Sequence, residues 1–371
     1  MAIDDPDNWG YYSELNINNP SPDYQMRLVL KRGTGTNDPT KGIIYDGGNC
    51  SYDDMRDVRV GTDSDPAAAE QLPQWTESIT SGVERILWVK SNGNSTIYLF
   101  VGNSNASEYS DGDNTFIFFD DFESLDLDKW DTSDAQSGSI IEIVGGRLHL
   151  KGYSGKRAII KTKNNLGIDY DCIYEMMMEP KAYATSGVYP NLSDGTNIFI
   201  NIKWISWDAN ELYLYNGTTL HKFNWNKDNN KRVKIDCFLP STKKFDVYLD
   251  DNLIAQNYDA YSASFTGVLN QIYFKAGASA NGGEVYIDNL FIRKYASTEP
   301  TWDSFGVWQE ISPPPPPPTP SGGLSDINVT PARVITTDFP AAAGLPKDQK
   351  IRIYAKAVSG QEKEILLDAL T

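Results

Sequence analysis

Short runs in which apolar and polar residues alternate dominate the chain, and Gly, Asn, Asp and Ser separate these runs. Alternation with period two is typical of β-strands that bury one face. Clear examples are residues 25–30, 84–89, 95–101 and 245–250. We find no run with helical periodicity and helix caps that exceeds about three turns. The sequence therefore predicts an all-β protein, and its 371 residues suffice for two or three domains that each bury a core.

Residues 1–115 are predicted to form an N-terminal β-sandwich. Its ordered motifs are a Trp9 segment, Asp-Asp-x-Arg-x-x-Arg at 53–59, Leu-Pro-Gln-Trp-Thr-Glu at 72–77, Ile-Leu-Trp-Val-Lys at 86–90 and Tyr-Leu-Phe-Val-Gly-Asn at 98–103. This order resembles domain-of-unknown-function family 2341, which occurs in archaeal and bacterial surface proteins, often just before a concanavalin-like domain. The sequence departs from that family at Val101, where Tyr is usual. The resemblance implies a surface setting but no chemistry, because none is established for the family.

Residues 116–296 resemble a concanavalin-A-like lectin or glucanase domain with a jelly-roll fold. The segments that carry this resemblance are 118–130, 145–150, 245–250 and 285–293. The resemblance implies that the first and last strands lie side by side, which would bring Asp121 and Glu123 near Asp288. It specifies the fold better than the ligand.

These three acids are the candidate metal ligands of the chain. Related jelly rolls often hold a structural Ca²⁺ where the first and last strands meet, and carboxylate oxygens are the ligands that Ca²⁺ prefers. An ion bound by Asp121, Glu123 and Asp288 would fasten two strands together without touching a ligand. The alternative is that the three acids cap strand ends in water.

Residues 297–320 are predicted to be a linker that leads to a small C-terminal module. Six consecutive prolines, 313–318, favour a polyproline II rod of about 20 Å, which acts as a spacer. Residues 321–371 contain three strand-like runs, at 332–336, 350–358 and 364–370. Because so few residues make a thin core, we predict that neighbouring copies or particle subunits stabilise this β-module as an anchor or assembly element.

The net charge of −17 argues against a nucleic-acid partner, because no cluster of Lys and Arg is present to neutralise phosphates. The charge is also uneven along the chain. Residues 1–115 contain 18 acidic and 8 basic residues, residues 116–318 contain 26 and 19, and residues 319–371 contain 6 of each. The first two domains are therefore expected to be acidic and exposed, and the neutral tail is expected to pack against something.

Several features predict an extracellular location. No apolar run is long enough to span a membrane, the N-terminus does not read as a signal peptide, and six Asn-x-Ser/Thr sequons begin at residues 49, 94, 105, 191, 216 and 328. Incorporation into a virion, or a leader removed before Met1, would explain export. Cys172 and Cys237 could form a disulfide or stay two buried thiols, and two His in all make a His-based zinc site unlikely.

Glu175 and Glu179 are the best candidates for a catalytic carboxylate pair. They face the same side of one predicted strand at a separation of roughly 13 Å, too far for a retaining glycosidase pair at about 5.5 Å. Jelly-roll glucanases use Glu-x-Asp-x-x-Glu, and this chain lacks the central Asp that would tune the acid. We therefore predict that the protein is not an enzyme and that this strand half faces the core.

An aromatic-rich stretch is the best candidate for a carbohydrate-binding surface. Exposed rings stack on the apolar faces of sugars, and neighbouring amides bind sugar hydroxyls. The alternative is that these rings fill the space between two sheets. The candidate residues are Trp204, Trp207, Tyr213, Tyr215 and Trp225, with Asn224 and Asn226 beside the last ring.

The sequence as a whole favours a non-enzymatic structural or adhesion protein. We expect it to be a component of a virion (tail, spike or capsid decoration) or of an extracellular filament. Its jelly roll would bind glycans or a host surface, and its C-terminal module would anchor it. The alternatives are a secreted carbohydrate-binding protein of a cell envelope and a glycoside hydrolase of jelly-roll type.

Overall fold

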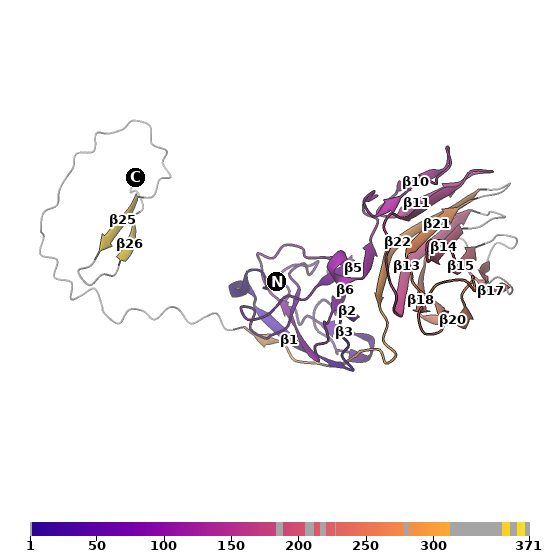
Figure 1. Cartoon of the computed structure of the whole chain (residues 1–371). Coiled ribbons are helices and arrows are strands. Elements are labelled where there is room, and N and C mark those ends of the chain that lie inside the picture. The colour runs from indigo at the N-terminus through magenta and orange to yellow at the C-terminus, as the bar shows by residue number, and fades with distance from the viewer. Residues whose placement is uncertain are drawn as a thin grey trace, which may run out of the picture. The chain divides into compact units, whose positions relative to one another are not determined.

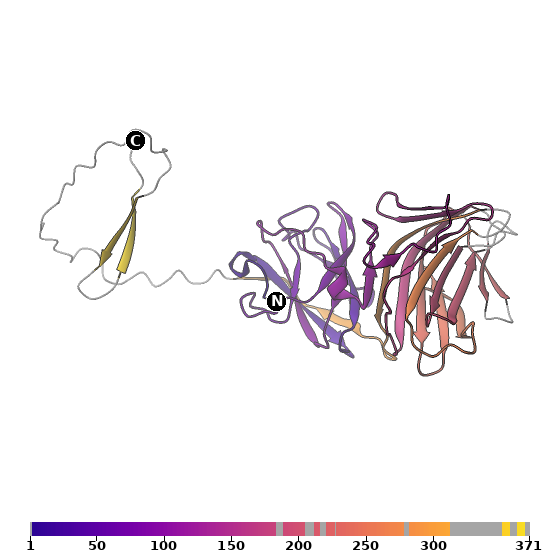
Figure 2. The ribbon, with the colours of Figure 1, turned by 45° about the horizontal axis from the view of Figure 1, so that its top comes forward.

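The computed structural model describes residues 2–182, 188–204, 211–215, 220–226, 228–277, 282–311, 351–356 and 362–367. The chain divides into two units, Met1–Pro314 and Pro315–Thr371. The first unit contains two β-sandwiches that lie next to each other, as Figures 1 and 2 show. In the described part of the second unit, β25 (Ile351–Lys356) and β26 (Glu362–Leu367) form an antiparallel hairpin. The predicted run at 332–336 lies outside the described residues.

The all-β prediction is confirmed. Among the described residues, the α-helix is confined to α1 (Gly112–Thr115), and short 3-10 turns occur at η1 (Pro6–Asn8) and η2 (Pro39–Lys41). No helix in this part of the chain is long and apolar enough to cross a membrane.

The first sandwich packs two sheets over a core that includes Leu15, Leu28, Leu87 and Leu99. In one sheet the strand order is β23-β1-β7-β4, and β24 also pairs with β1. The other has the order β3-β2-β6-β5. The bounds of these strands are β1 (Tyr11–Asn18), β2 (Gln25–Lys31), β3 (Ile43–Tyr45), β4 (Arg59–Gly61), β5 (Gln74–Thr80), β6 (Glu84–Lys90), β7 (Thr96–Val101), β23 (Thr301–Phe305) and β24 (Gln309–Glu310).

The chain returns to this first sandwich after completing the second, which corrects the predicted linker. Strands β23 and β24 both pair with β1. The Trp302 ring packs into the first core and donates a hydrogen bond from Nε1 to Arg27 O at 2.9 Å, and Trp308 Nε1 donates to Tyr45 O at 2.7 Å. The linker therefore does not begin at residue 297. Two Trp anchors and the ladder to β1 make residues 301–311 part of the first domain.

The second sandwich has the two large antiparallel sheets of a jelly roll. In the described residues, one sheet has eight strands in the order β10-β11-β22-β13-β18-β19-β20, with β8 on β22, and the other has seven in the order β17-β16-β15-β14-β21-β12-β9. The eight are β8 (Phe118–Asp120), β10 (Ile140–Ile143), β11 (Leu148–Gly152), β13 (Cys172–Ala182), β18 (Lys231–Phe238), β19 (Lys244–Leu249), β20 (Asn252–Asp259) and β22 (Gly283–Lys294). The seven are β9 (Trp130–Asp131), β12 (Ala158–Thr162), β14 (Val188–Ser193), β15 (Ile198–Trp204), β16 (Glu211–Tyr215), β17 (Leu220–Asn224) and β21 (Gln271–Ala276).

The first and last strands of this domain lie side by side, as the resemblance implied. β8 pairs antiparallel with β22, with Asp120 opposite Leu290. Figure 1 shows β22 lying beside β11 and β13 in the same sheet. Cys172 and Cys237 face each other across β13 and β18 as free, fully buried thiols.

The two sandwiches join through a buried aromatic cluster. Its rings come from both domains and are Trp75, Trp88, Phe116, Phe119 and Phe291. Hydrogen bonds cross the same contact, because Gln25 Nε2 donates to Thr115 O at 2.8 Å and Lys294 N donates to Gln25 Oε1 at 2.9 Å. The outer face of the eight-stranded sheet is thus partly covered, whereas the seven-stranded sheet lies on the other side of the jelly-roll core (Figures 1 and 2).

Candidate functional site

A polar groove of about 390 Å³ lies on the outward face of the seven-stranded sheet. Strands β14, β15 and β21 form it, and each alternates between core and groove. The residues that point into the core are Leu192, Ile202, Ile272 and Phe274. Because successive side chains of a strand point to opposite faces, the residues between them line the groove. The polar ones are Asn191, Ser193, Asn201, Gln271, Tyr273 and Lys275, and Thr196 adds a hydroxyl from the β14–β15 turn.

The strand register brings the central polar residues together. Asn191 on β14 is opposite Asn201 on β15 and also opposite Tyr273 on β21. Ser193 is opposite Gln271 in the next row on this face. Two amides and a phenol therefore form one row across three strands, with a hydroxyl and a third amide beside them.

The two asparagines carry an unusual feature for buried side chains. Each is only 5% exposed, yet within the described part of the chain neither Oδ1 has a hydrogen-bond partner. A buried acceptor that lacks a partner costs about 1–3 kcal/mol of folding free energy. Both oxygens belong to side chains that line the same groove. The fold thus retains two costly acceptors where a ligand would supply the donors.

Among the aromatic residues predicted to bind carbohydrate, Trp225 is the one whose side chain the structure describes, and it does not lie on the surface. The Trp225 ring is 1% exposed, belongs to the jelly-roll core and donates from Nε1 to Asn229 O at 2.9 Å. The surface role predicted for Trp225 is therefore wrong, and the core alternative holds. Asn224 and Asn226 beside it are exposed.

The remaining aromatic candidates cannot be assigned to the groove from their side chains. Trp204 ends β15, and Tyr213 and Tyr215 belong to β16, but their side chains lie outside the described residues, as does Trp207 entirely. Sequence reasoning missed Asn191 and Asn201. Their signal was an amide placed between apolar residues on a strand, at Pro190-Asn191-Leu192 and Ile200-Asn201-Ile202.

Glu175, one of the two candidate catalytic acids, belongs to a buried ion-pair network between the sandwiches. Arg293 Nε donates to its Oε1 at 2.6 Å, and Arg232 Nη1 donates to its Oε2 at 3.0 Å. Burial by itself would raise the pKa of Glu175, but the charges of the two arginines outweigh it and hold that pKa below its usual value. A carboxylate held ionised in this way does not suit a general acid.

The same network reaches into the first sandwich. Arg232 also forms an ion pair with Glu77, and Glu77 Oε2 accepts a hydrogen bond from Trp88 Nε1 at 2.7 Å. Arg293 Nη1 donates to the Tyr24 hydroxyl at 2.9 Å. Polar contacts thus continue the interdomain aromatic cluster.

Glu179, the second candidate catalytic acid, is also paired. It accepts a hydrogen bond from Arg147 Nη1 at 2.7 Å and forms an ion pair with Lys181. Burial opposes the charged form, yet these two cations lower the pKa of Glu179. The neighbouring Tyr174, Met176 and Met178 point into the core, so the strand is half inward as predicted. Neither glutamate is available as a free acid.

The predicted calcium ligands Asp121, Glu123 and Asp288 lie near one another where β8 and β22 meet. Burial raises the pKa of Asp288 to about 6, and the charges of Glu123 and Asp121 add to that shift, while Asn289 N and Arg147 oppose it. Among the described residues, no three His, Cys, Asp or Glu side chains are placed to hold a metal ion. Calcium binding at Asp121, Glu123 and Asp288 therefore stays a prediction.

The raised pKa of Asp288 allows the calcium prediction to be tested through the stability of the protein. Because folding raises the pKa of Asp288 from the ordinary value of 3.8 to about 6, the folded state is penalised as pH rises from 3.8 through 6. Replacing Asp288 by Asn is expected to raise the unfolding free energy at pH 7 by about 1–3 kcal/mol in a chelator-treated sample.

Adding Ca²⁺ provides the contrast, measured as the melting temperature of each variant. Bound Ca²⁺ would favour the ionised carboxylate, so it should raise the melting temperature of the unmodified protein and leave Asp288→Asn unaffected. A melting temperature of the unmodified protein that does not respond to Ca²⁺ would show that these acids form no calcium site.

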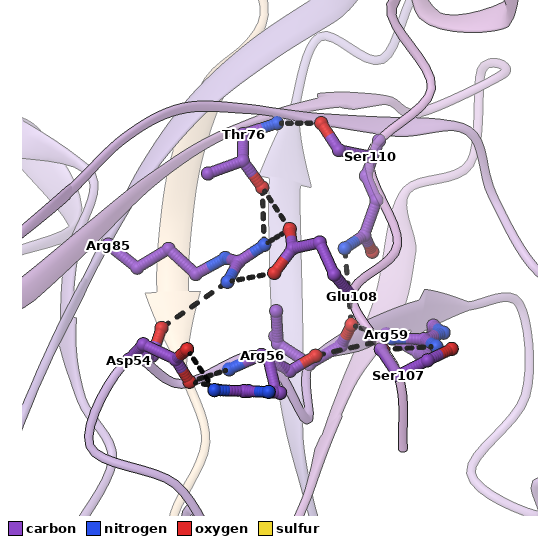
Figure 3. Close-up of polar contacts among 10 residues, drawn as sticks. Asp54, Arg56, Arg59, Thr76, Arg85, Ser107, Glu108 and Ser110 are labelled. Atoms are coloured by element: carbon purple, nitrogen blue, oxygen red, sulfur yellow. Dashed lines mark hydrogen bonds and ion pairs between the residues drawn. The ribbon is translucent and has the colours of Figure 1, made fainter. Parts of the chain in front are cut away.

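The Asp-Asp-x-Arg-x-x-Arg motif fastens the segment that leads from the first sandwich to the second (Figure 3). Arg59 is 1% exposed, forms a two-point ion pair with Asp4 and donates from Nη2 to Ser107 O at 3.0 Å. Its guanidinium also lies over the Tyr109 ring at 5.2 Å. Asp54 accepts a hydrogen bond from Arg56 Nε at 3.0 Å.

A second buried arginine holds the same segment. Arg85 is fully buried, forms an ion pair with Glu108 and donates from Nη1 to Asp54 O at 3.3 Å. Thr76 N donates to Ser110 Oγ at 2.9 Å close by (Figure 3). The segment between β7 and α1 is thus fixed along its length, which gives this motif an architectural role.

A family of known proteins matches one part of the chain. The family described as Domain of unknown function (DUF2341) matches residues 54–133. This confirms the resemblance inferred from the ordered motifs. The match covers the motif strand, the fastened segment and the first strands of the jelly roll.

A curated relative extends the similarity along the chain. An uncharacterized protein of Methanocaldococcus jannaschii is 26% identical over 285 residues, which are 70% of this chain and 48% of that protein. The chain therefore spans about half the length of this relative.

Solved structures similar to the chain include three whose descriptions refer to carbohydrates. One belongs to work on endo-acting O-glycanases of the human gut microbiota (TM-score 0.38, 12% identity, covering 49% of this chain and 100% of that one). A cellulose-induced protein has TM-score 0.35 and 14% identity over 49% of this chain and 97% of its own. A carbohydrate-binding module from Bacillus subtilis has TM-score 0.31 and 15% identity over 45% and 96%. The jelly-roll assignment rests on the strand order given above.

Proposed function

We propose that the protein binds carbohydrate, and that the ligand occupies the groove on the seven-stranded sheet. The observation that carries this proposal is the pair of buried, unpartnered amide oxygens of Asn191 and Asn201 among the described residues. Sugar hydroxyls are donors as well as acceptors, so they would satisfy both oxygens on binding. The groove volume of about 390 Å³ is in the usual range for small-ligand sites.

The rest of the lining supports a hydroxyl-rich ligand. Ser193, Thr196 and Gln271 offer neutral donors and acceptors, and Tyr273 offers a ring and a hydroxyl. Amide and hydroxyl groups next to an aromatic ring can orient a sugar through hydrogen bonds and ring stacking, without a charged side chain.

The position of the groove supports a display role. The first sandwich packs against the eight-stranded sheet, through residues such as Phe291 and Arg293, so the seven-stranded sheet faces away from that contact. We propose that the first sandwich serves as a platform and the jelly roll as the adhesive head of an extracellular protein. Placement in a virion, a filament or a cell envelope stays a prediction.

We further propose that binding occurs without turnover. Glycoside hydrolysis needs two carboxyl groups that flank the scissile bond. Among the described lining residues of the groove there is no Asp or Glu. Glu175 and Glu179 are on the other sheet and are held by arginine and lysine.

The decisive experiment replaces each groove asparagine by leucine in the full chain. The unpartnered oxygens contribute no hydrogen bond to the fold, so Asn191→Leu and Asn201→Leu should leave thermal stability unchanged or slightly raised. Each variant should nevertheless lose at least about tenfold in affinity for whichever glycan the unmodified protein selects from an array. Glycan-array screening identifies the glycan, and calorimetry then measures both the affinity for that glycan and the thermal stability of each variant.

Asn226→Leu is the matched control, because Asn226 is exposed beside Trp225 and does not line the groove. It should bind as the unmodified protein does. Loss of binding in Asn226→Leu, with full binding in the groove variants, would move the site to the loop predicted from sequence. Absence of binding to every glycan on the array would overturn the proposed function.

A further inference from the structure

The groove differs in charge from the protein that carries it. The whole chain has a net charge of −17. Among the described residues that line the groove, however, Lys275 is charged and there is no carboxylate. The described groove lining therefore contains one cation and no carboxylate, on a protein that is acidic as a whole.

The same bias extends across the strands of the seven-stranded sheet. Lys161 on β12 pairs with Asp131 and Asp134, and the other charged residues of these strands are Lys203, Lys222 and Lys275 against Glu211. Backbone register places Lys275 opposite Tyr189, and Tyr213 opposite both Lys203 and Lys222. Lysine and tyrosine positions thus recur along neighbouring strands beside the row that contains Asn191 and Asn201.

Three acids on or beside this sheet have partners in the protein. Asp131, on edge strand β9, lies 3.6 Å from Lys161, and Asp134 lies 2.6 Å from the same ammonium. Asp194, in the turn next to the groove, accepts backbone hydrogen bonds from Thr196 N at 2.9 Å, Asn197 N at 2.6 Å and Thr266 N at 3.0 Å. Fixed backbone dipoles therefore offset the charge of Asp194, which weakens its repulsion of an anion.

We propose that the groove selects an acidic glycan, one that carries carboxylate or sulfate groups, and that Lys275 binds the acidic group. This inference rests on the proposed function, because it names the class of carbohydrate for the same site. Asn191 and Asn201 accept hydrogen bonds from ring hydroxyls, while Lys275 forms a charge-assisted hydrogen bond to the anionic oxygen. Neutral glycans satisfy the amides but leave Lys275 without an ionic partner in the ligand.

The test compares glycans that differ only in charge, using the full chain and measuring affinity by biolayer interferometry. Polygalacturonate is paired with its methyl-esterified, neutral form, and dextran sulfate with dextran. The acidic member of at least one pair should bind about tenfold or more tightly than its neutral partner at low salt. That preference should shrink as salt rises, because salt screens the interaction of exposed charges. The pair that shows the preference identifies carboxylate or sulfate as the recognised group.

Variants at Lys275 connect the preference to the groove. Lys275→Gln should weaken binding of the acidic glycan by about fivefold and leave its neutral partner unchanged, whereas Lys275→Arg should retain most of the affinity. Lys41→Gln, which removes the same charge from an exposed site in the first sandwich, is the matched control and should have no effect.

The outcomes separate this inference from the proposed function. Equal binding of acidic and neutral partners, lost in Asn191→Leu, would overturn the acidic preference and leave carbohydrate binding intact. Equal losses in Lys275→Gln and Lys41→Gln would show non-specific attraction and overturn the role of Lys275. Binding to no glycan in either pair, or on an array, would overturn both.

Discussion

Replacing Glu175 by alanine is expected to lower the free energy of unfolding by about 3–5 kcal/mol at neutral pH. The carboxylate is 2% exposed and accepts hydrogen bonds from Arg293 and Arg232. Its removal leaves two largely buried guanidinium groups without their shared anion, and that uncompensated charge is what makes the change costly. Chemical denaturation followed by tryptophan fluorescence measures the loss, because Trp75 and Trp88 lie at the same contact.

The pH dependence of this loss provides a further check. The two arginines hold the pKa of Glu175 in the folded protein below its ordinary value, so its stabilising contribution is present above that ordinary value and disappears as pH falls through the folded pKa. The difference in stability between the unmodified protein and Glu175→Ala should therefore narrow under acidic conditions. Glu142→Ala, which removes a carboxylate that is 53% exposed, is a control with a small expected effect.

A second variant, Glu175→Gln, distinguishes a structural role for Glu175 from a catalytic one. A catalytic carboxylate can usually be replaced with retention of the fold and loss of turnover. Here Glu175→Gln should lose stability, because an amide oxygen cannot neutralise two arginines. A fully stable Glu175→Gln protein would contradict the interdomain role.

Replacing Trp302 by alanine in the full chain is expected to destabilise the first sandwich by about 3–5 kcal/mol. The ring packs in the first core although it comes from the far end of the chain, and it anchors β23 through Arg27 O. The expected result is an earlier thermal transition and loss of hydrogen-exchange protection in β1, which pairs with β23. Val307→Ala is a suitable control, because Val307 is 75% exposed in the same segment.

Two truncated chains test whether the first domain needs the strands that follow residue 296, the domain end predicted from the sequence. A chain that ends at residue 311 keeps β23 and β24 and should fold its first sandwich normally. A chain that ends at residue 296, the predicted domain end, exposes one edge of β1 and removes Trp302 and Trp308 from the core, so it should be poorly soluble. Equal stability of the two chains would show that the returning strands are dispensable.

Much of the local structure could be predicted from the order of residues. Glu175 and Glu179 were predicted to share one face of a strand that half faces the core, and Tyr174, Met176 and Met178 between and beside them do point into the core. The jelly-roll resemblance also placed β8 next to β22 correctly. Period-two alternation is a property of consecutive residues, and each strand therefore displays its own two faces whatever surrounds it.

The candidate site was harder to predict, because it depends on which faces remain uncovered. Trp225 flanked by Asn224 and Asn226 resembles an exposed loop, yet the ring is in the core. Asn191 begins a sequon, which suggests an exposed acceptor, yet its side chain is 5% exposed and lies in the groove lining. The packing of β14 between β15 and β21 decides the position of Asn191, and the packing of the ring into the jelly-roll core decides that of Trp225.

The sequence by itself determined the all-β class and the two sandwiches, and the resemblance to a jelly roll implied the pairing of its first and last strands. Only the tertiary structure decided which distant residues contact each face of a strand. Glu175 meets Arg293 across 118 residues, and Trp302 meets Arg27 across 275. Such contacts depend on loop closure and on the complementary shape of surfaces far apart in the chain, and no pattern of neighbouring residues records them.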